Sequence, residues 1–393
     1  MKKVLIIGAG FLQSFVIRKA KEMGYYTIAV DGNPNAEGFK YTDKYSVINI
    51  IDESACYQYA VEQKIDGVLT AATDYGVLTA AYIAEKMKLN GLYYDVAKII
   101  KNKYQVRKKL SESNADDTKQ AYEVENHSDV EKLIGLLDYP LMVKPCDGSG
   151  SRGASKVENE AELWNACEVA INNSVIRKAL IESFIIGNEY GAESFVFDGV
   201  INILAVMKKW MTKPPYYAEL GHAIPSGLPE DIEEKIKSSV KKSITALGIN
   251  YGSVNMDLLL SENNDVHIID IGARMGGNMI GSHIIPIGTG VDYMGIMIQG
   301  AVGDLKTCNI HTENTKGNVI TRLLALTPGK IKEIPDIAYI EKRYNVKIFH
   351  HLHVGDCINE YHTNLDGMGY IISVSEKNAV EALRFIDENI IRE

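Results

Sequence analysis

The sequence predicts a protein of mixed α/β and α+β class. Three observations predict it: strands and helices alternate rapidly over residues 1–98, a glycine-rich loop interrupts apolar strands over residues 99–316, and a small strand–helix pattern fills residues 317–393. A chain of 393 residues also exceeds what one ordinary hydrophobic core holds. We therefore expect three units, the central one divided into a small subdomain (about 115–183) and a large subdomain (about 184–316).

The first unit is expected to be a doubly wound α/β domain. The apolar run Val4–Ile7 is typical of a buried parallel strand, and a Gly-Ala-Gly turn leads from it into a helix. This opening looks like a dinucleotide fold with Asp31 at the ribose position, but Gln13 stands where a third glycine is usual. A structural or substrate-facing turn is therefore preferred over NAD binding. Asp74 follows a later strand, where open sheets bind ligands, but capping of the next helix is the safer interpretation of this residue taken alone.

The composition restricts the classes of binding partner and the cellular compartment that we expect. The net charge is −9 and no basic run is visible, which argues against nucleic acid. The five cysteines are scattered without a CxxC pair, as in reduced cytoplasmic proteins. The apolar run near the start is too short for a signal peptide, and no stretch approaches the ~18 apolar residues of a membrane helix. We expect a soluble, cytoplasmic protein that acts without a membrane.

Residues 141–153 are the most distinctive stretch, with the sequence LMVKPCDGSGSRG. An apolar strand ends in Lys144, and a loop with three glycines follows. Glycine lets a backbone approach an anion closely, and lysine supplies a point charge suited to phosphate. The stretch predicts a clamp for nucleotide phosphates, although a mobile hairpin is the better explanation of the loop when it is taken alone.

Two strands over residues 255–260 and 266–271 predict a hairpin that brings Asp257 and Asp270 face to face. Two carboxylates at that distance repel each other unless a divalent cation lies between them. Arg274 follows in a glycine-rich turn. The alternative, a pair of surface acids, is disfavoured because both aspartates stand in otherwise apolar strands.

Two segments between these motifs are predicted to contact ligands. Over residues 180–197, Glu182 and the backbone near Phe184 are placed to hold an adenine, and Glu189 to accept hydrogen bonds from a ribose. Residues 213–229 are rich in proline and glycine, which predicts an ordered loop over the site.

That loop contains Glu219 and His222. His222 is a candidate general base for an amine substrate, with a satisfied loop histidine as the alternative. A strand carrying the sequence His-His-x-His from His350 does not place three ligands on one face, so a metal site there is disfavoured.

The order of these parts resembles the ATP-grasp superfamily, in its carboxylate–amine ligase branch, which is also similar to biotin carboxylase and the halves of carbamoyl-phosphate synthetase. The resemblance covers the whole chain and is carried by the sequences NKYQVR, YPLMVKPCDGSGSRG, IESFIIGNEY, NMDLLL and IIDIGARMGG. It implies a Rossmann-like N-terminal domain, an ATP-grasp domain whose two α+β subdomains clamp ATP, and a C-terminal lid module.

The resemblance also implies roles for individual residues. It places ATP against Lys103, Lys144, Gly148, Ser149, Gly150, Ser151, Glu182, Phe184 and Glu189. It places magnesium (one or two ions, with manganese as a substitute) at Asp257 and Asp270, and it makes Arg274 and Lys144 catalytic. The candidate substrate residues are Asp74, Lys209, Glu219, His222, Arg274 and Asn278. The chain departs from the family at Asp270, where glutamate is usual, and at Gly272, where asparagine is usual, which affects the coordination of a second ion.

The implied reaction transfers the γ-phosphoryl group of ATP to a small carboxylate and couples the acyl phosphate to an amine, with amino acids among the candidate substrates and a homodimer as the candidate assembly. A bicarbonate-activating enzyme that forms carboxyphosphate is the nearest alternative. A nucleotide-binding module without catalysis, which Asp270 and Gly272 favour, is the alternative of another class.

Overall fold

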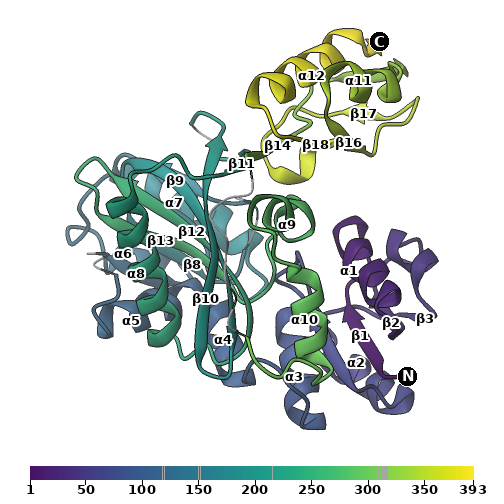
Figure 1. Ribbon diagram of the computed structural model, residues 1–393. Helices are drawn as coiled ribbons and strands as arrows, with labels where there is room; N and C mark the ends of the chain where they lie inside the picture. Colours follow the sequence, from purple (N-terminus) through teal and green to yellow (C-terminus); the bar gives the residue numbers. More distant parts are fainter. Residues whose placement is uncertain are drawn as a thin grey trace.

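The computed structural model describes residues 1–116, 118, 120–148, 150, 152–214, 216–308, 310 and 317–393. Its elements form four sheets, and Figure 1 shows a C-terminal lobe standing apart from the N-terminal sheet. No helix of these residues is long and apolar enough to cross a membrane.

The N-terminal domain is built on a four-stranded parallel sheet, as the sequence predicts. Its order is β3 (Lys44–Val47), β2 (Tyr26–Asp31), β1 (Lys3–Ile7) and β4 (Gly67–Thr70). The crossover helices are α1 (Phe11–Glu22), α2 (Glu53–Gln63) and α3 (Val77–Met87). The Val4–Ile7 run of β1 is fully buried, which explains its continuous apolar sequence. The sequence also predicts a strand over residues 46–50, and β3 begins and ends earlier than that.

A second four-stranded sheet carries the glycine-rich loop. Its order is β5 (Ala121–Val124), β8 (Ala179–Ser183), β6 (Leu141–Pro145) and β7 (Ser155–Val157). Helix α7 (Glu160–Asn173) covers it through apolar residues such as Leu163 and Cys167. The sequence predicts a helix over residues 128–137, and the observed helix α6 (His127–Glu131) is shorter than that. The short helices α4 (Tyr94–Lys101) and α5 (Lys103–Glu112) precede this sheet in the chain.

The largest sheet has eight strands and runs across the expected boundary at residue 316. Its order is β13 (Val266–Gly272), β12 (Gly252–Ser261), β9 (Gly187–Phe197), β10 (Val200–Met211), β11 (Glu219–Ile224), β14 (Val319–Leu323), β18 (Gly369–Ser373) and β16 (Lys347–His350). The predicted loop at 213–229 is therefore wrong in part, because β11 occupies its centre. Gly221 permits the close approach of β11 and β14: a Cβ there would lie 2.1 Å from the Thr321 carbonyl oxygen.

Helices join the large sheet to its neighbours. Helix α8 (Glu230–Ala246) packs on one face, whereas α10 (Tyr293–Ala301) lies between the large sheet and the N-terminal sheet (Figure 1). One apolar core, which includes Ile6, Phe195 and Tyr293, runs through all three. A π-helical turn (Ile280–Ile284) and α9 (Ile285–Thr289) precede α10.

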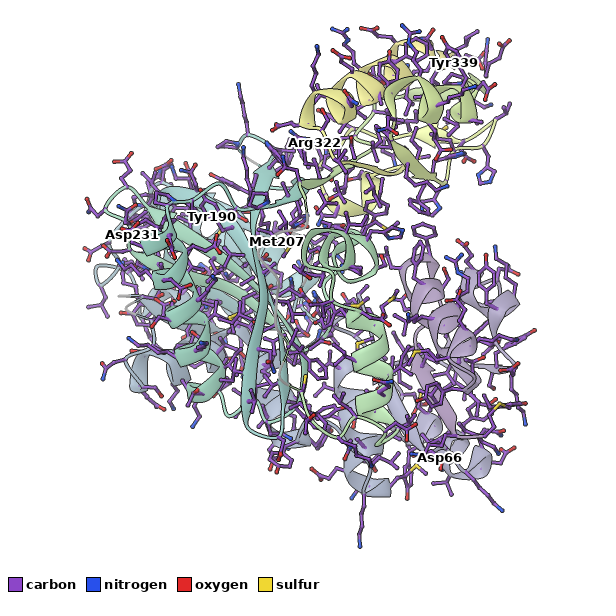
Figure 2. The ribbon with its side chains drawn as sticks, in the orientation of Figure 1. Asp66, Tyr190, Met207, Asp231, Arg322 and Tyr339 are labelled. Atoms are coloured by element: carbon purple, nitrogen blue, oxygen red, sulfur yellow. The ribbon has the colours of Figure 1, made fainter. Side chains whose placement is uncertain are left out.

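The C-terminal module extends the large sheet and adds its own helices. They are α11 (Ile337–Tyr344) and α12 (Glu376–Asn389), beside a small sheet of β17 (Cys357–Ile358), β15 (Gly329–Glu333) and β19 (Ile391–Arg392). Figure 2 shows Arg322 at the junction, and its guanidinium carbon lies 3.7 Å from the centroid of the Trp210 ring. A 3-10 turn (Asn364–Asp366) points back toward β11, since Asn364 contacts Glu219.

Candidate active site

A cleft of about 1230 Å³ opens where the N-terminal domain, the two central sheets and the C-terminal module meet. It is lined by every described residue that the sequence predicts for the site, from Asp74 to Asn278. Ser149 and Ser151, predicted to contact phosphate, lie outside the described residues. The tertiary structure therefore brings together side chains that are spread over some two hundred positions of the sequence.

Glu182 holds two cations at the centre of the cleft. Its two carboxylate oxygens lie 2.6 Å from Lys144 Nζ and 2.6 Å from Arg107 Nε. Arg107 also donates to the Ile269 carbonyl at 2.6 Å, which ties α5 to β13. Burial alone would raise the pKa of Glu182, but the two cations outweigh it and hold that pKa below its usual value.

This arrangement changes two sequence-based expectations. The i,i+4 spacing of Lys103 and Arg107 on one predicted helix face is usually that of solvated side chains unless an anion lies above them, and Glu182 is such an anion for Arg107. The carboxylate of Glu182, predicted to hold adenine, is instead engaged by the two cations. The Phe184 N–H donates to the Pro140 carbonyl at 3.1 Å and is thus not available to read an adenine edge.

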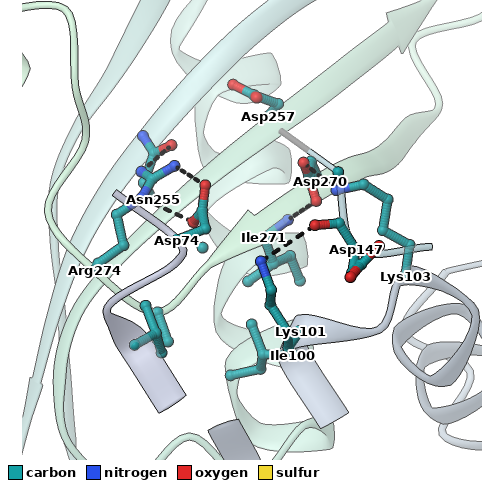
Figure 3. A pocket seen from close by; sticks show the side chains of 14 residues that line it. Asp74, Ile100, Lys101, Lys103, Asp147, Asn255, Asp257, Asp270, Ile271 and Arg274 are labelled. Carbon is teal, nitrogen blue, oxygen red and sulfur yellow. Dashed lines mark hydrogen bonds and ion pairs between the residues drawn. The ribbon is translucent and has the colours of Figure 1, made fainter. Parts of the chain in front are cut away.

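The predicted pair of aspartates is confirmed as a structural feature. Asp257 and Asp270 are direct partners in the β12–β13 register. Each carboxylate also meets a lysine: Lys209 Nζ lies 2.7 Å from Asp257 Oδ1, and Lys103 Nζ lies 2.5 Å from Asp270 Oδ2 (Figure 3 shows the latter pair). Burial raises the pKa of Asp257 to about 6 despite Lys209. Burial opposes ionisation of Asp270 too, but Lys103 and Lys144 lower its pKa.

The two aspartates fit a metal ion that arrives with a nucleotide. Magnesium is usually held by one or two carboxylates together with phosphates and water, because it gives up its water reluctantly. Within the described ranges, no three His, Cys, Asp or Glu side chains gather to form a complete metal site of their own. The donor set therefore suits a phosphate-bound ion and not a permanent structural one.

Lys209 is the centre of an acidic cluster. Its ammonium lies 2.7 Å from both Glu219 and Asp257 and 3.2 Å from Glu189, and its side chain is 1% exposed. Burial opposes the charge on Lys209, yet these carboxylates raise its pKa well above the usual value. Three carboxylates share one ammonium, so this end of the cleft carries an excess of negative charge.

His222 lies against this cluster and is almost wholly buried. Its Nε2 is 3.8 Å from Glu219, and its Nδ1 has no hydrogen-bond partner among the described residues. Burial lowers the pKa of His222 to about 4. The imidazole is therefore neutral at pH 7 and is a weak base, which argues against the predicted role as general base.

The C-terminal module completes the acidic end, a contribution that sequence reasoning missed. Asn364 Nδ2 donates to Glu219 Oε2 at 2.8 Å, and Asn364 Oδ1 accepts from the Glu219 N–H at 3.0 Å. Asn278 donates to the same carboxylate, and the Tyr361 hydroxyl donates to the Glu219 carbonyl at 2.5 Å. Asn364 stands in a segment without any motif, so nothing local could have identified it.

Arg274 pairs with Asp74 across the cleft (Figure 3). Arg274 Nη2 donates to Asp74 Oδ2 at 3.0 Å, and Nε lies 2.9 Å from Oδ1. Burial disfavours the guanidinium charge, but Asp74 raises the pKa of Arg274 further above its usual value. The alternative of a helix cap is wrong, because α3 begins after Gly76 without any side-chain cap.

The base of the glycine-rich loop is anchored. The Asp147 carboxylate accepts hydrogen bonds from Ser174 Oγ (2.7 Å) and from the N–H groups of Val175 and Ile176. Farther along, Arg152 Nη2 donates to the Tyr75 hydroxyl at 2.7 Å, so the loop also contacts the N-terminal domain. Gly148 and Gly150 line the cleft.

The dinucleotide alternative loses its support. The Asp31 carboxylate accepts from the Ala9 N–H at 2.8 Å, and Gln13 fills the turn by donating to the Ala71 carbonyl at 2.6 Å. The acid and the turn that would bind NAD are thus occupied by contacts within the fold.

Residues 137–282 match the ATP-grasp domain family. These residues form an ATP-grasp domain. Among curated relatives, the formate-dependent phosphoribosylglycinamide formyltransferase of Sulfurisphaera tokodaii is 24% identical over 276 residues, which cover 67% of each chain. The D-alanine–D-alanine ligase of Thermosipho africanus is 27% identical over 150 residues, covering 36% of this chain and 40% of the relative.

Solved structures of ATP-grasp relatives match over the full chain. The phosphoribosylglycinamide synthetase of Anaerococcus prevotii is 26% identical with a TM-score of 0.77, and all of both chains is covered. The L-amino acid ligase of Bacillus licheniformis is 24% identical with a TM-score of 0.85, covering 100% of this chain and 99% of the other. Four curated relatives are matched over only 51% to 67% of their lengths.

These likenesses confirm the predicted mixed α/β fold and the predicted place in the carboxylate–amine ligase branch.

Proposed function

We propose that this enzyme ligates small molecules that include a free amino acid, by way of an acyl phosphate. The observation that carries the proposal is the division of charge along the cleft. Lys103, Lys144 and Arg107 gather at one end, and the carboxylates around Lys209 gather at the other. A phosphate chain is attracted to the first end and a cation to the second.

The basic end suits ATP. Lys144 and Lys103 would hold the phosphates, and Gly148 and Gly150 would cover them; all four line the cleft. Glu189, which pairs with Lys209, would accept hydrogen bonds from the ribose where the basic end meets the acidic end. Phosphoryl transfer depends on positioning and on neutralising charge, which these side chains supply. Magnesium or manganese held by Asp257 and Asp270, as one or two ions, supplies further charge neutralisation on the phosphates when it is bound.

The reaction places the acid between the two ends, beside Arg274. A carboxylate oxygen of the substrate bonds to the γ-phosphorus, and the bond from that phosphorus to the β-bridging oxygen breaks to release ADP. The amine nitrogen, in its neutral form, then attacks the acyl carbon, and the C–O bond to phosphate breaks. The departing phosphate takes up the proton that the nitrogen loses, and an amide and inorganic phosphate result. Arg274 stabilises the negative charge on the transferred group, and a closed cleft keeps water from the acyl phosphate.

The acidic end suits an ammonium group and disfavours a phosphate ester. Glu219 is held ionised: burial would raise its pKa, but Lys209 and its other partners lower that pKa to about 2. We infer that Glu219 pairs with the substrate ammonium and that neutral His222 accepts a hydrogen bond from it. Asn278 and Lys209 would orient Glu219, and Asp74 would orient Arg274. A phosphoribosyl substrate would meet these carboxylates at a cost of several kcal/mol.

ADP release from the purified enzyme, measured with pairs of amino acids and with amino acids plus small carboxylates, tests the proposal. We expect release only when both partners are present, together with a product whose mass is the sum of the two less water. Release that depends on bicarbonate would favour the carboxyphosphate alternative. ATP binding that is indifferent to magnesium, without turnover on any pair, would favour a non-catalytic module and contradict the proposal.

A further inference from the structure

Glu193 is a buried carboxylate that the proposed reaction does not use. It stands in the middle of β9, is 0% exposed, and accepts three hydrogen bonds. The donors are the Tyr293 hydroxyl (2.7 Å), the Asn255 amide (2.9 Å) and the Gly276 N–H (3.0 Å). In the part of the chain that the structure describes, no cation forms an ion pair with it. The nearby charge of Arg274 offsets only part of the cost that burial imposes on the charge of Glu193. A buried, ionisable group without an ion-paired cation is costly and calls for a reason.

The contacts of Glu193 lead directly to Arg274. Asn255 donates its Nδ2 to Glu193 Oε2, and its Oδ1 accepts from Arg274 Nη1 at 3.2 Å. Figure 3 shows Asn255, a residue of β12, beside Arg274. Gly276 lies in the turn that follows Arg274, and a Cβ there would come within 2.9 Å of Glu193 Oε2. Glu193 therefore holds two features next to Arg274: the side-chain amide of Asn255 and the turn at Gly276.

We propose that Glu193 is a positioning residue for Arg274 and acts through the orientation of the Asn255 amide. An ionised carboxylate only accepts hydrogen bonds, so it compels Asn255 to present its NH₂ inward and its oxygen to the guanidinium. With Asp74 on its other side, Arg274 is then held by acceptors from two domains. The proposal rests on the proposed function in one respect, namely that Arg274 faces the transferred phosphoryl group.

A neutral glutamine at position 193 would reverse this chain of hydrogen bonds. Its amide oxygen would still accept the hydrogen bonds from the Tyr293 hydroxyl and the Gly276 N–H, and its NH₂ would face Asn255. Asn255 would then turn its oxygen inward and present its NH₂ to Arg274, where two donors oppose each other. Replacing Asn255 with aspartate in the same protein restores the pattern, because a carboxylate accepts from both neighbours.

The test compares the wild type, Glu193→Gln, and the double variant Glu193→Gln/Asn255→Asp. The affinity of each full-length protein for Mg·ADP is measured by calorimetry at pH 8, where Glu193 is ionised. It is measured alone and with aluminium fluoride, which imitates a phosphoryl group in transfer. We expect fluoride to tighten ADP binding about tenfold or more in the wild type. Glu193→Gln should lose most of that tightening with ADP affinity unchanged, and the double variant should regain it.

Tyr293→Phe is the matched control, because it removes one donor to Glu193 without changing the orientation of Asn255. It should keep the fluoride response, and thermal unfolding of every variant should show a folded protein. A fluoride response that survives Glu193→Gln, or that the double variant fails to regain, would overturn the proposal. A wild type that binds Mg·ADP without any fluoride response would overturn it as well, by removing Arg274 from the phosphoryl group. Failure of the acid–amine panel with an intact fluoride response would instead count only against the proposed reaction.

Discussion

Asp74 and Arg274 form a bidentate contact between two domains. Arg274 Nη2 lies 3.0 Å from Asp74 Oδ2, and Arg274 Nε lies 2.9 Å from Asp74 Oδ1. The aspartate follows β4 of the N-terminal sheet, and the arginine follows β13 of the large sheet. Nearby, the Ala72 N–H donates to the Met275 carbonyl at 3.0 Å, so backbone contacts fix the same two segments. The N-terminal domain thus supplies part of the geometry of the candidate site.

Asp74→Asn should lower turnover by about 10- to 100-fold, because hydrogen bonds to charged groups contribute about 1.5–3 kcal/mol and this pair fixes the guanidinium. The affinity for ATP, measured by calorimetry, should change little, since Asp74 contacts none of the lysines that face the phosphates. Asp95→Asn removes an exposed carboxylate that pairs only with Lys98 and is the matched control. Equal loss of ATP affinity and turnover in Asp74→Asn would contradict this role.

Lys144→Ala should abolish turnover and weaken ATP binding by about tenfold or more, while circular dichroism shows an intact fold. Lys144 supplies a cation at the phosphate end, and Arg107 remains to neutralise Glu182 in its absence. Lys132→Ala, which removes an exposed lysine on a distant turn, should behave as the wild type. Near-normal turnover in Lys144→Ala would refute the assignment of residues 141–153 as a phosphate clamp.

Lys209→Met should destabilise the protein by about 3–5 kcal/mol at pH 8, because buried carboxylates lose the ammonium that they share. Their pKa values would then rise above those of the unfolded chain, so stability is retained at low pH and lost as pH rises. The deficit relative to the wild type should therefore shrink toward pH 5 in denaturant titrations. A deficit that is the same at pH 5 and pH 8 would show that packing, not charge, sets the loss.

Burial raises the pKa of Glu193 to about 7, from 4.5, although Tyr293, Gly276 and Asn255 act in the opposite direction. The folded protein binds this proton more tightly than the unfolded chain does, so the contribution to stability is full below pH 4.5 and is lost as pH rises through 7. Glu193→Gln lacks this titration. The variant should therefore gain stability relative to the wild type between pH 5 and pH 8. The gain, measured as the difference between the two melting temperatures, should correspond to about 2–3 kcal/mol in the free energy of unfolding.

A flat difference in melting temperature across that range would contradict the pKa assigned to Glu193. A gain in stability at pH 8 that accompanies the loss of fluoride response would instead show that the carboxylate is kept for positioning at a cost to the fold.

Local patterns predicted the parts of the cleft that lie close together along the chain. The strand that ends in Lys144 and the glycines after it follow from short-range chemistry. The facing of Asp257 and Asp270 follows from one hairpin, in which side chains alternate with a period of two. These features could be read in sequence because strand periodicity and turn residues act over a few positions.

The partners of these side chains depended on how distant elements pack. Arg107 meets Glu182, Asn364 meets Glu219, and Glu193 meets Asn255 only because the order of strands in the sheets brings them together. A buried charge takes whichever partner the packing places within reach, and the cost of leaving it unpaired makes that choice decisive. The residue types for phosphate and metal chemistry were therefore evident in the sequence, whereas the sharing of charge among them was decided by the tertiary structure.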